Sequence, residues 1–159
     1  MKKYKAGLVV GRFQPFHLGH KFLVEEALKI CETLIIGIGS SNIIDNQNPY
    51  SYEKREKFLK AFIKDAGIEK KVVKIIPIED DPDDDIWFQK LIASAGKFDV
   101  GVGDNEWVNG IFENFGVAVV RVGLYMRETL EGTKIRTLLD KKLEVSDRIP
   151  SYIKQLINN

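Results

Sequence analysis

Both histidines of this chain, His17 and His20, lie within the ten-residue stretch Gly11-Arg12-Phe13-Gln14-Pro15-Phe16-His17-Leu18-Gly19-His20. A spacing of three places both rings on the same side of a helix that begins there. The first turn of such a helix also offers main-chain N–H groups that have no partner within the helix and that attract anions. Gly11 frees the chain as it leaves a strand, and Gly19 allows close approach of a ligand. The stretch therefore predicts a phosphate-binding site.

Paired histidines have two other common uses. A zinc site needs further ligands at suitable spacing, but no third ligand is visible, and the only cysteine, Cys31, falls on the expected core face of a helix. Two purely structural histidines would leave Arg12 and the flanking glycines unexplained. Anion binding is the reading that accounts for all of these residues.

A second basic turn follows near the C-terminus, in Gly132-Thr133-Lys134-Ile135-Arg136. Gly132 and Thr133 suit another helix start, and Arg136 one turn later supplies a bidentate fork for phosphate oxygens. Such a string is common when it stands alone. Together with the histidine stretch it gives two anion sites, which indicates a polyphosphate ligand.

The most biased segment is acidic, Glu79-Asp80-Asp81-Pro82-Asp83-Asp84-Asp85. Clustered carboxylates can hold a metal ion, and they can also form a solvated loop that caps the following helix. Acidic residues before a helix suit the positive end of its dipole. We favour the capping loop.

The elements that must position these residues alternate regularly. Short Val- and Ile-rich runs, typical of strands covered on both faces, alternate with segments of helical spacing. The expected strands are 6–10, 34–38, 72–78, 100–102 and 117–122. The expected helices are 18–32, 53–66, 85–95 and 105–115, and Gly67 is expected to end the second of them. A tail helix is expected over 146–156, with Ser146 as its cap, and it should pack on the sheet edge or on a partner subunit. This order predicts an α/β fold, with a doubly wound five-stranded parallel sheet, helices on both faces and a C-terminal helix.

Composition sets the remaining bounds. The 159 residues carry 24 Lys and Arg against 23 Asp and Glu, a net charge of +1, so no general field attracts nucleic acid or a membrane. We find no apolar run of about 18 residues and no signal-peptide pattern, and the single cysteine excludes an internal disulfide. A cytoplasmic location is the default. With no linker or composition shift, residues 1–159 are expected to form a single domain.

The histidine stretch resembles the HxGH nucleotidylyltransferases, and the archaeal-type nicotinamide mononucleotide (NMN) adenylyltransferases in particular. Sister families usually have Ser or Thr at the position of Arg12 and Asp at that of Gln14. The segment Gly132–Arg136 resembles the second motif of the family. Further similarities are Asn48-Pro49-Tyr50-Ser51 with Arg55, and Pro77, Asp80 and Trp87, so that the resemblance covers nearly the whole chain.

The resemblance implies a Rossmann-like nucleotidylyltransferase that moves AMP from ATP to NMN and forms NAD and pyrophosphate. It also implies Mg²⁺ that bridges the phosphate oxygens, without a dedicated metal site on the protein. The protein would further be a homo-oligomer, often a hexamer. The catalytic residues would be His17, His20 and Arg136. The phosphate-binding residues would be Gly11, Arg12, Phe13, Gly19, Gly132, Thr133 and Ile135. The NMN-binding residues would be Gly39, Ser40, Asn48, Asp80, Trp87, Gly103 and Asn105.

The chain also departs from the family pattern. Glu131 stands where Ser is usual, Thr129 and Leu130 replace Arg and Tyr, and Asp84 occupies a position expected to bear an amide. Alternatives therefore remain: a nucleotidylyltransferase with another phosphorylated acceptor or CTP, or a catalytically silent nucleotide sensor. Trp87 has two readings as well, a platform for the nicotinamide ring or a core side chain.

Overall fold

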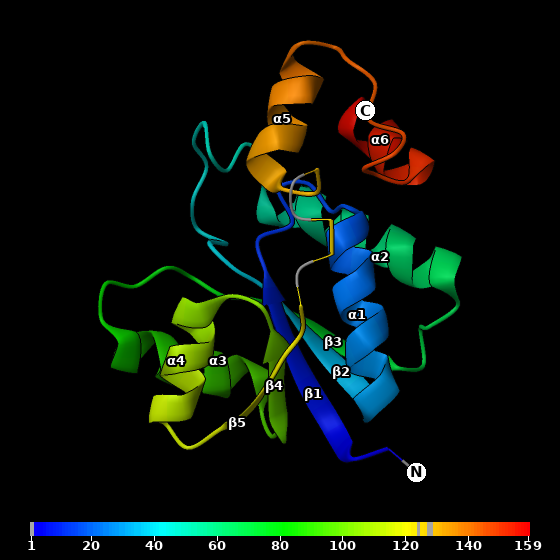
Figure 1. The fold of residues 1–159 in the computed structure, drawn as a ribbon. Helices are drawn as coiled ribbons and strands as arrows, with labels where there is room; N and C mark the ends of the chain where they lie inside the picture. The colour runs from blue at the N-terminus through cyan, green and yellow to red at the C-terminus, as the bar shows by residue number, and fades with distance from the viewer. Residues whose placement is uncertain (1, 124, 127–128) are drawn as a thin grey trace.

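The computed structural model describes residues 2–123, 125–126 and 129–159. Its centre is a parallel sheet of five strands, as predicted, and their order is β3-β2-β1-β4-β5 (Figure 1). The strands are β1 (Tyr4–Gly11), β2 (Cys31–Ile38), β3 (Val72–Pro77), β4 (Val100–Gly103) and β5 (Ala118–Arg121). The central strands carry unbroken buried runs, because both of their faces are covered by helices.

Helices cover the two faces of the sheet in pairs. They are α1 (Leu18–Ile30), α2 (Tyr52–Ala66), α3 (Asp84–Ala95), α4 (Glu106–Asn114), α5 (Gly132–Asp140) and α6 (Ser151–Ile157). Figure 1 shows α1 and α2 on one face and α3 and α4 on the other, with α5 and α6 at one end. Each face has its own hydrophobic cluster, one around Phe58 and Phe62 and the other around Trp87 and Phe112.

Three helix boundaries can be compared with the prediction: the ends of α2 and α1, and the start of α6. Gly67 ends α2 in the left-handed conformation, with φ 68°, as predicted. The prediction that the first helix reaches Glu32 is wrong. Cys31 is already extended and pairs with Tyr4, so β2 begins directly where α1 ends.

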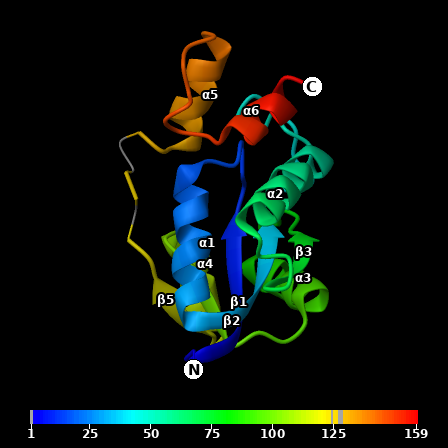
Figure 2. The same ribbon diagram turned by 90° about the vertical axis from the view of Figure 1, so that its right-hand side faces the viewer.

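The prediction of a tail helix capped by Ser146 is also wrong. Residues 146–148 form a turn, in which the Glu144 carboxylate accepts the N–H of Ser146, and α6 begins only after Pro150. Proline has no N–H and disfavours a helical residue before it, so it suits the position before a helix rather than its interior. The tail helix packs on α2 and not on the sheet edge (Figure 2).

The strand order determines where the site lies. From β1 the chain moves to β2 and β3 on one side, and β4 and β5 then extend the other side. The loops after β1 and β4 therefore leave the sheet in opposite directions, and a crevice opens between them at the carboxyl ends of the strands. In the described part of the chain, no helix is long and apolar enough to cross a membrane.

Candidate active site

The two histidines form the start of α1. His17 is the N-cap residue, and its Nδ1 accepts the N–H of Gly19 at 3.0 Å. His20 completes a capping box, because its Nδ1 accepts the N–H of His17 at 3.1 Å. The rings stack with centroids 3.7 Å apart, and a Cβ on Gly19 would lie 2.8 Å from the His17 ring. The group that lies close to Gly19 is therefore the ring of His17, from the same loop.

These caps determine which nitrogen of each ring bears a proton. An Nδ1 that accepts a main-chain N–H carries no hydrogen, so in the neutral ring the proton lies on Nε2. Burial, and secondarily the neighbouring His17, holds the pKa of His20 well below its usual value. His20 is thus a neutral Nε2–H donor at pH 7. The sequence analysis did not predict that both histidines cap the helix. The available signal was their separation of three residues, which is also the separation of the two residues of a capping box.

Two guanidinium groups lie near these rings. Arg136, on α5, is 8% exposed, and its Nη1 donates to the Gln14 carbonyl at 2.8 Å. Burial, followed by the charge of Arg12, lowers the pKa of Arg136. Within the described residues, neither Arg12 nor Arg136 is ion-paired with a carboxylate. Two adjacent cations without an acidic partner form a place where an anion is favourable.

Gln14 connects three segments of the site, and sequence reasoning did not identify it. Its side-chain amide exchanges two hydrogen bonds with the main chain of Tyr50, at 3.0 and 3.1 Å. Its own carbonyl accepts from Arg136, while Arg12 donates to the Asn48 side chain at 3.1 Å. The loop after β1, the segment before α2 and the start of α5 are therefore fixed to one another.

These segments enclose a cavity of about 270 Å³ at the carboxyl end of β1. Most of the predicted phosphate-binding and catalytic residues line it together with Asn105, namely Gly11, Arg12, Phe13, His17, Gly19, His20, Gly132, Thr133 and Arg136. Apolar residues that the sequence did not indicate complete the wall, including Phe22 and Tyr125, whose rings stack 4.8 Å apart.

A second cavity, of about 530 Å³, adjoins the first and shares Gly11, Arg12 and Asn105 with it. It is lined by Gly39, Ser40, Asp80 and Trp87 from the predicted NMN set, and by Asp81 and Trp107. Asp80 accepts a hydrogen bond from the Ser40 hydroxyl at 2.9 Å. The combination offers aromatic rings, carboxylates and one arginine to a single ligand.

The tryptophans of this second cavity differ in exposure. Trp87 is 3% exposed and belongs to the core cluster below α3 and α4, so its core reading holds while its edge also lines the cavity. Trp107 is 52% exposed and meets Trp87 edge-on, with ring centroids 5.3 Å apart. The accessible aromatic face thus belongs to Trp107. Its place as the second residue of α4, shortly after a strand's carboxyl end, was the available sequence signal.

Three predicted ligand residues lie outside both cavities. Ile135 is fully buried in the core, because it lies on the inner face of α5, so its assignment as a phosphate contact is corrected. Asn48 is buried and supports Arg12. The carbonyl of Gly103 accepts a hydrogen bond from the Asn109 side chain, so this residue connects its loop to α4.

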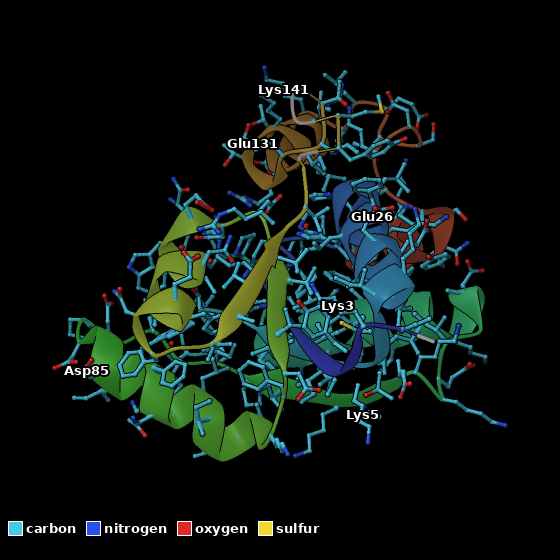
Figure 3. All side chains as sticks on the ribbon, turned by 60° about the horizontal axis from the view of Figure 1, so that its bottom comes forward. Lys3, Lys5, Glu26, Asp85, Glu131 and Lys141 are labelled. Carbon is cyan, nitrogen blue, oxygen red and sulfur yellow. The ribbon has the colours of Figure 1, made fainter. Side chains whose placement is uncertain are left out.

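The departures from the family pattern have local explanations. Glu131 is the N-cap residue of α5 and lines the first cavity, but its carboxylate lies 3.7 Å from the Lys134 ammonium, which offsets its charge. Figure 3 shows Glu131 at the end of the molecule far from Lys3 and Lys5, where α5 begins. Asp84 is the exposed first residue of α3 and lines neither cavity.

The acidic run forms the loop before α3. Asp83 is the N-cap residue, and its carboxylate accepts the N–H groups of Asp85 and Ile86, which confirms the predicted capping. Among the described residues, no group of three or more His, Cys, Asp or Glu side chains could hold a metal ion.

Known proteins resemble this chain over most of its length. The family model described as cytidylyltransferase-like matches residues 8–148, a range that includes both basic motifs. The chain belongs to the cytidylyltransferase-like family. A nicotinamide-nucleotide adenylyltransferase of Methanolobus tindarius is 31% identical over 150 residues, which cover 94% of this chain and 85% of that protein. Its counterpart in Saccharolobus solfataricus is 32% identical over 152 residues, 95% of this chain and 88% of that one.

Solved structures share the fold of this chain. A bifunctional NMN adenylyltransferase/ADP-ribose pyrophosphatase of Francisella tularensis superimposes with a TM-score of 0.84 at 23% identity, over 98% of this chain. The match covers 50% of that protein, so the chain spans half of its length. The same protein in complex with AMP and a manganese ion gives a TM-score of 0.79 at 24% identity.

Proposed function

We propose that this protein is an NMN adenylyltransferase, which transfers the AMP group of ATP to NMN and releases NAD and pyrophosphate. The observation that carries the proposal is the pair of adjoining cavities. One joins two histidines to two arginines that form no ion pair with any described carboxylate, and the other joins tryptophans to carboxylates. Relatives named nicotinamide-nucleotide adenylyltransferase, aligned over 94–95% of the chain, support the same reaction.

The reaction needs alignment more than acid–base chemistry. The 5′-phosphate of NMN is ionised at pH 7 and attacks the α-phosphorus of ATP in line. The new P–O bond forms as the bond to pyrophosphate breaks, and no protein nucleophile or proton transfer is required. Negative charge builds on the α-phosphate and on the leaving group, so well-placed donors and cations lower the barrier.

Five residues of the first cavity have a part in this scheme. The Nε2–H groups of His17 and His20 donate to the α- and β-phosphates, with no rearrangement because their rings are already fixed by the caps of α1. Arg136 and Thr133 bind the leaving pyrophosphate, and Arg12 binds the acceptor phosphate between the two cavities. Mg²⁺ would accompany ATP as part of the substrate and would offset the negative charge of its phosphates.

The second cavity suits the base of NMN. Nicotinamide in the nucleotide is a flat cation, which the face of Trp107 and the carboxylate of Asp80 attract, whereas Asp81 is paired with Lys90 at 3.4 Å. Nicotinate mononucleotide carries an additional carboxylate, which Asp80 repels. We therefore expect NMN to be used with the higher kcat/KM.

The deciding experiment is an assay of the purified protein with Mg²⁺, ATP and NMN, in which NAD and pyrophosphate are measured. Parallel reactions replace NMN by nicotinate mononucleotide or pantetheine phosphate, and ATP by CTP. NAD formation at the highest kcat/KM supports the proposal. Pyrophosphate release only with another acceptor or with CTP contradicts it, and tight NAD binding without turnover would instead indicate a nucleotide sensor.

We also propose that the protein is a homo-oligomer, and the hexamer implied by the resemblance is the specific form to test. Sedimentation equilibrium of the purified chain measures the assembly mass. A mass of one chain over the whole concentration range would contradict the proposal.

A further inference from the structure

Arg55 of α2 is a buried cation that the scheme above does not use. Its side chain is 0% exposed, and no carboxylate of the described residues forms an ion pair with it. The guanidinium instead donates to main-chain carbonyls only. Nε donates to Ser51 at 3.2 Å, Nη1 to Arg12 at 3.0 Å and to Gly39 at 2.7 Å, and Nη2 to Ser40 at 3.1 Å.

Burying an unpaired charge is costly, and apolar residues of similar size often stabilise a core as well or better. Stability of α2 alone is therefore a poor explanation for this side chain. Three of the four carbonyls lie in the loops after β1 and β2, next to both cavities. These loops are themselves joined, because Gly39 donates its N–H to the Gly11 carbonyl at 2.9 Å.

The direction of a carbonyl fixes the direction of the N–H that follows it. In a planar trans peptide the C=O and N–H point in opposite directions. Since the carbonyls of Arg12 and Gly39 point to Arg55, the N–H groups of Phe13 and Ser40 point away from it. Within the described residues, neither of these N–H groups donates to a protein acceptor. Phe13 lines the first cavity and Ser40 the second.

The local backbone does not adopt this arrangement by its own preference. Phe13 and Ser40 have φ values of 55° and 50°, in the left-handed region that side chains other than glycine rarely occupy. Contacts from the surrounding structure must hold them there. Arg55 is the side chain that contacts the peptide unit preceding each of the two residues.

We propose that Arg55 is a positioning residue, which holds the two loops so that the N–H groups of Phe13 and Ser40 face the phosphate groups of the bound substrates. This inference rests on the proposed function. The Phe13 N–H would serve ATP beside the histidines, and the Ser40 N–H would serve the acceptor. Arg55 itself touches neither substrate.

The test compares Arg55→Met with Leu59→Ala. Methionine keeps the apolar stem without the donors, and Leu59 is a fully buried residue of the same helix that makes no polar contact with the loops. We expect Arg55→Met to lower kcat about 10²-fold, the usual effect of misplaced binding groups. Leu59→Ala is expected to lower the melting temperature but to leave the kcat of the folded fraction within about twofold, since it disturbs only packing.

A second readout does not depend on turnover. With inorganic pyrophosphate as the probe for Phe13 and inorganic phosphate as the probe for Ser40, the two ¹⁵N–¹H signals should shift in the wild type and in Leu59→Ala, but not in Arg55→Met. Arg55→Lys keeps the charge but concentrates its donors on a single nitrogen. It is expected to fall between the wild type and the methionine variant in both readouts, and it serves as the test if Arg55→Met does not fold.

Two results would overturn the positioning role: a kcat in Arg55→Met as high as in Leu59→Ala, or signal shifts that persist when Arg55 is replaced. A failure of the proposed function looks different. In that case no NAD would form even with the wild type, while pyrophosphate and phosphate would still shift the two signals in an Arg55-dependent manner.

Discussion

Replacing His17 separates the two tasks that the structure gives to this ring. Its Nδ1 caps α1 by accepting the Gly19 N–H at 3.0 Å, while Nε2 bears the proton that can be donated to phosphate. Asparagine is a favoured N-cap residue, and its Oδ1 can accept the same N–H, but it has no group at the position of Nε2. Alanine removes both groups.

The two variants should therefore differ in stability and agree in activity. Loss of an N-cap costs about 1 kcal/mol, which lowers the melting temperature of a domain of this size by about 2–4 °C. His17→Ala should show that shift, and His17→Asn should remain close to the wild type. Both should lose about 10²- to 10³-fold in kcat, the usual effect of removing one donor to transition-state charge.

Thermal unfolding by circular dichroism and NAD formation with saturating ATP and NMN measure the two effects separately. Near-normal turnover in His17→Asn would refute the assignment of Nε2–H as a phosphate donor. An unchanged melting temperature in His17→Ala would refute the capping role. Either result would be decisive, because each concerns a different nitrogen of the same ring.

Three further predictions concern other parts of the site. Because the pKa of His20 is lowered, the native state binds fewer protons than the unfolded chain below pH ~6.5, so the free energy of unfolding should fall with decreasing pH by up to about 1.4 kcal/mol per pH unit. In urea unfolding, this free energy should depend less steeply on pH in His20→Asn than in the wild type, and equal slopes would contradict this account. Trp87→Ala should lower the free energy of unfolding by about 3–5 kcal/mol. Because Trp107 is half-exposed, Trp107→Ala should leave the stability nearly unchanged and raise the KM for NMN about tenfold. Equal losses of stability in chemical denaturation would refute the distinction between the two tryptophans. Arg136→Ala should raise the KM for ATP more than that for NMN, and equal effects in steady-state kinetics would move Arg136 out of the triphosphate site.

Local signals were sufficient for much of this protein. Unalternating Val and Ile runs separated by amphipathic segments indicated five parallel strands, because burial on both faces leaves that pattern in any sequence. Gly67 ended its helix where predicted, since few other residues adopt its left-handed conformation at low cost. The histidine and Gly132–Arg136 motifs were placed at helix starts because the signals for a helix start are themselves local.

Properties that depend on neighbours distant in sequence required the tertiary structure. The accessible tryptophan was identified only when the burial of Trp87 could be compared with that of Trp107. Arg55 was noted only as a match to the family pattern, with no role assigned to it, yet it reaches carbonyls 15 to 43 positions away. Residue types and spacing determine which groups are available for chemistry. The direction in which each group points is decided by hydrogen bonds and packing between segments, which no local pattern contains.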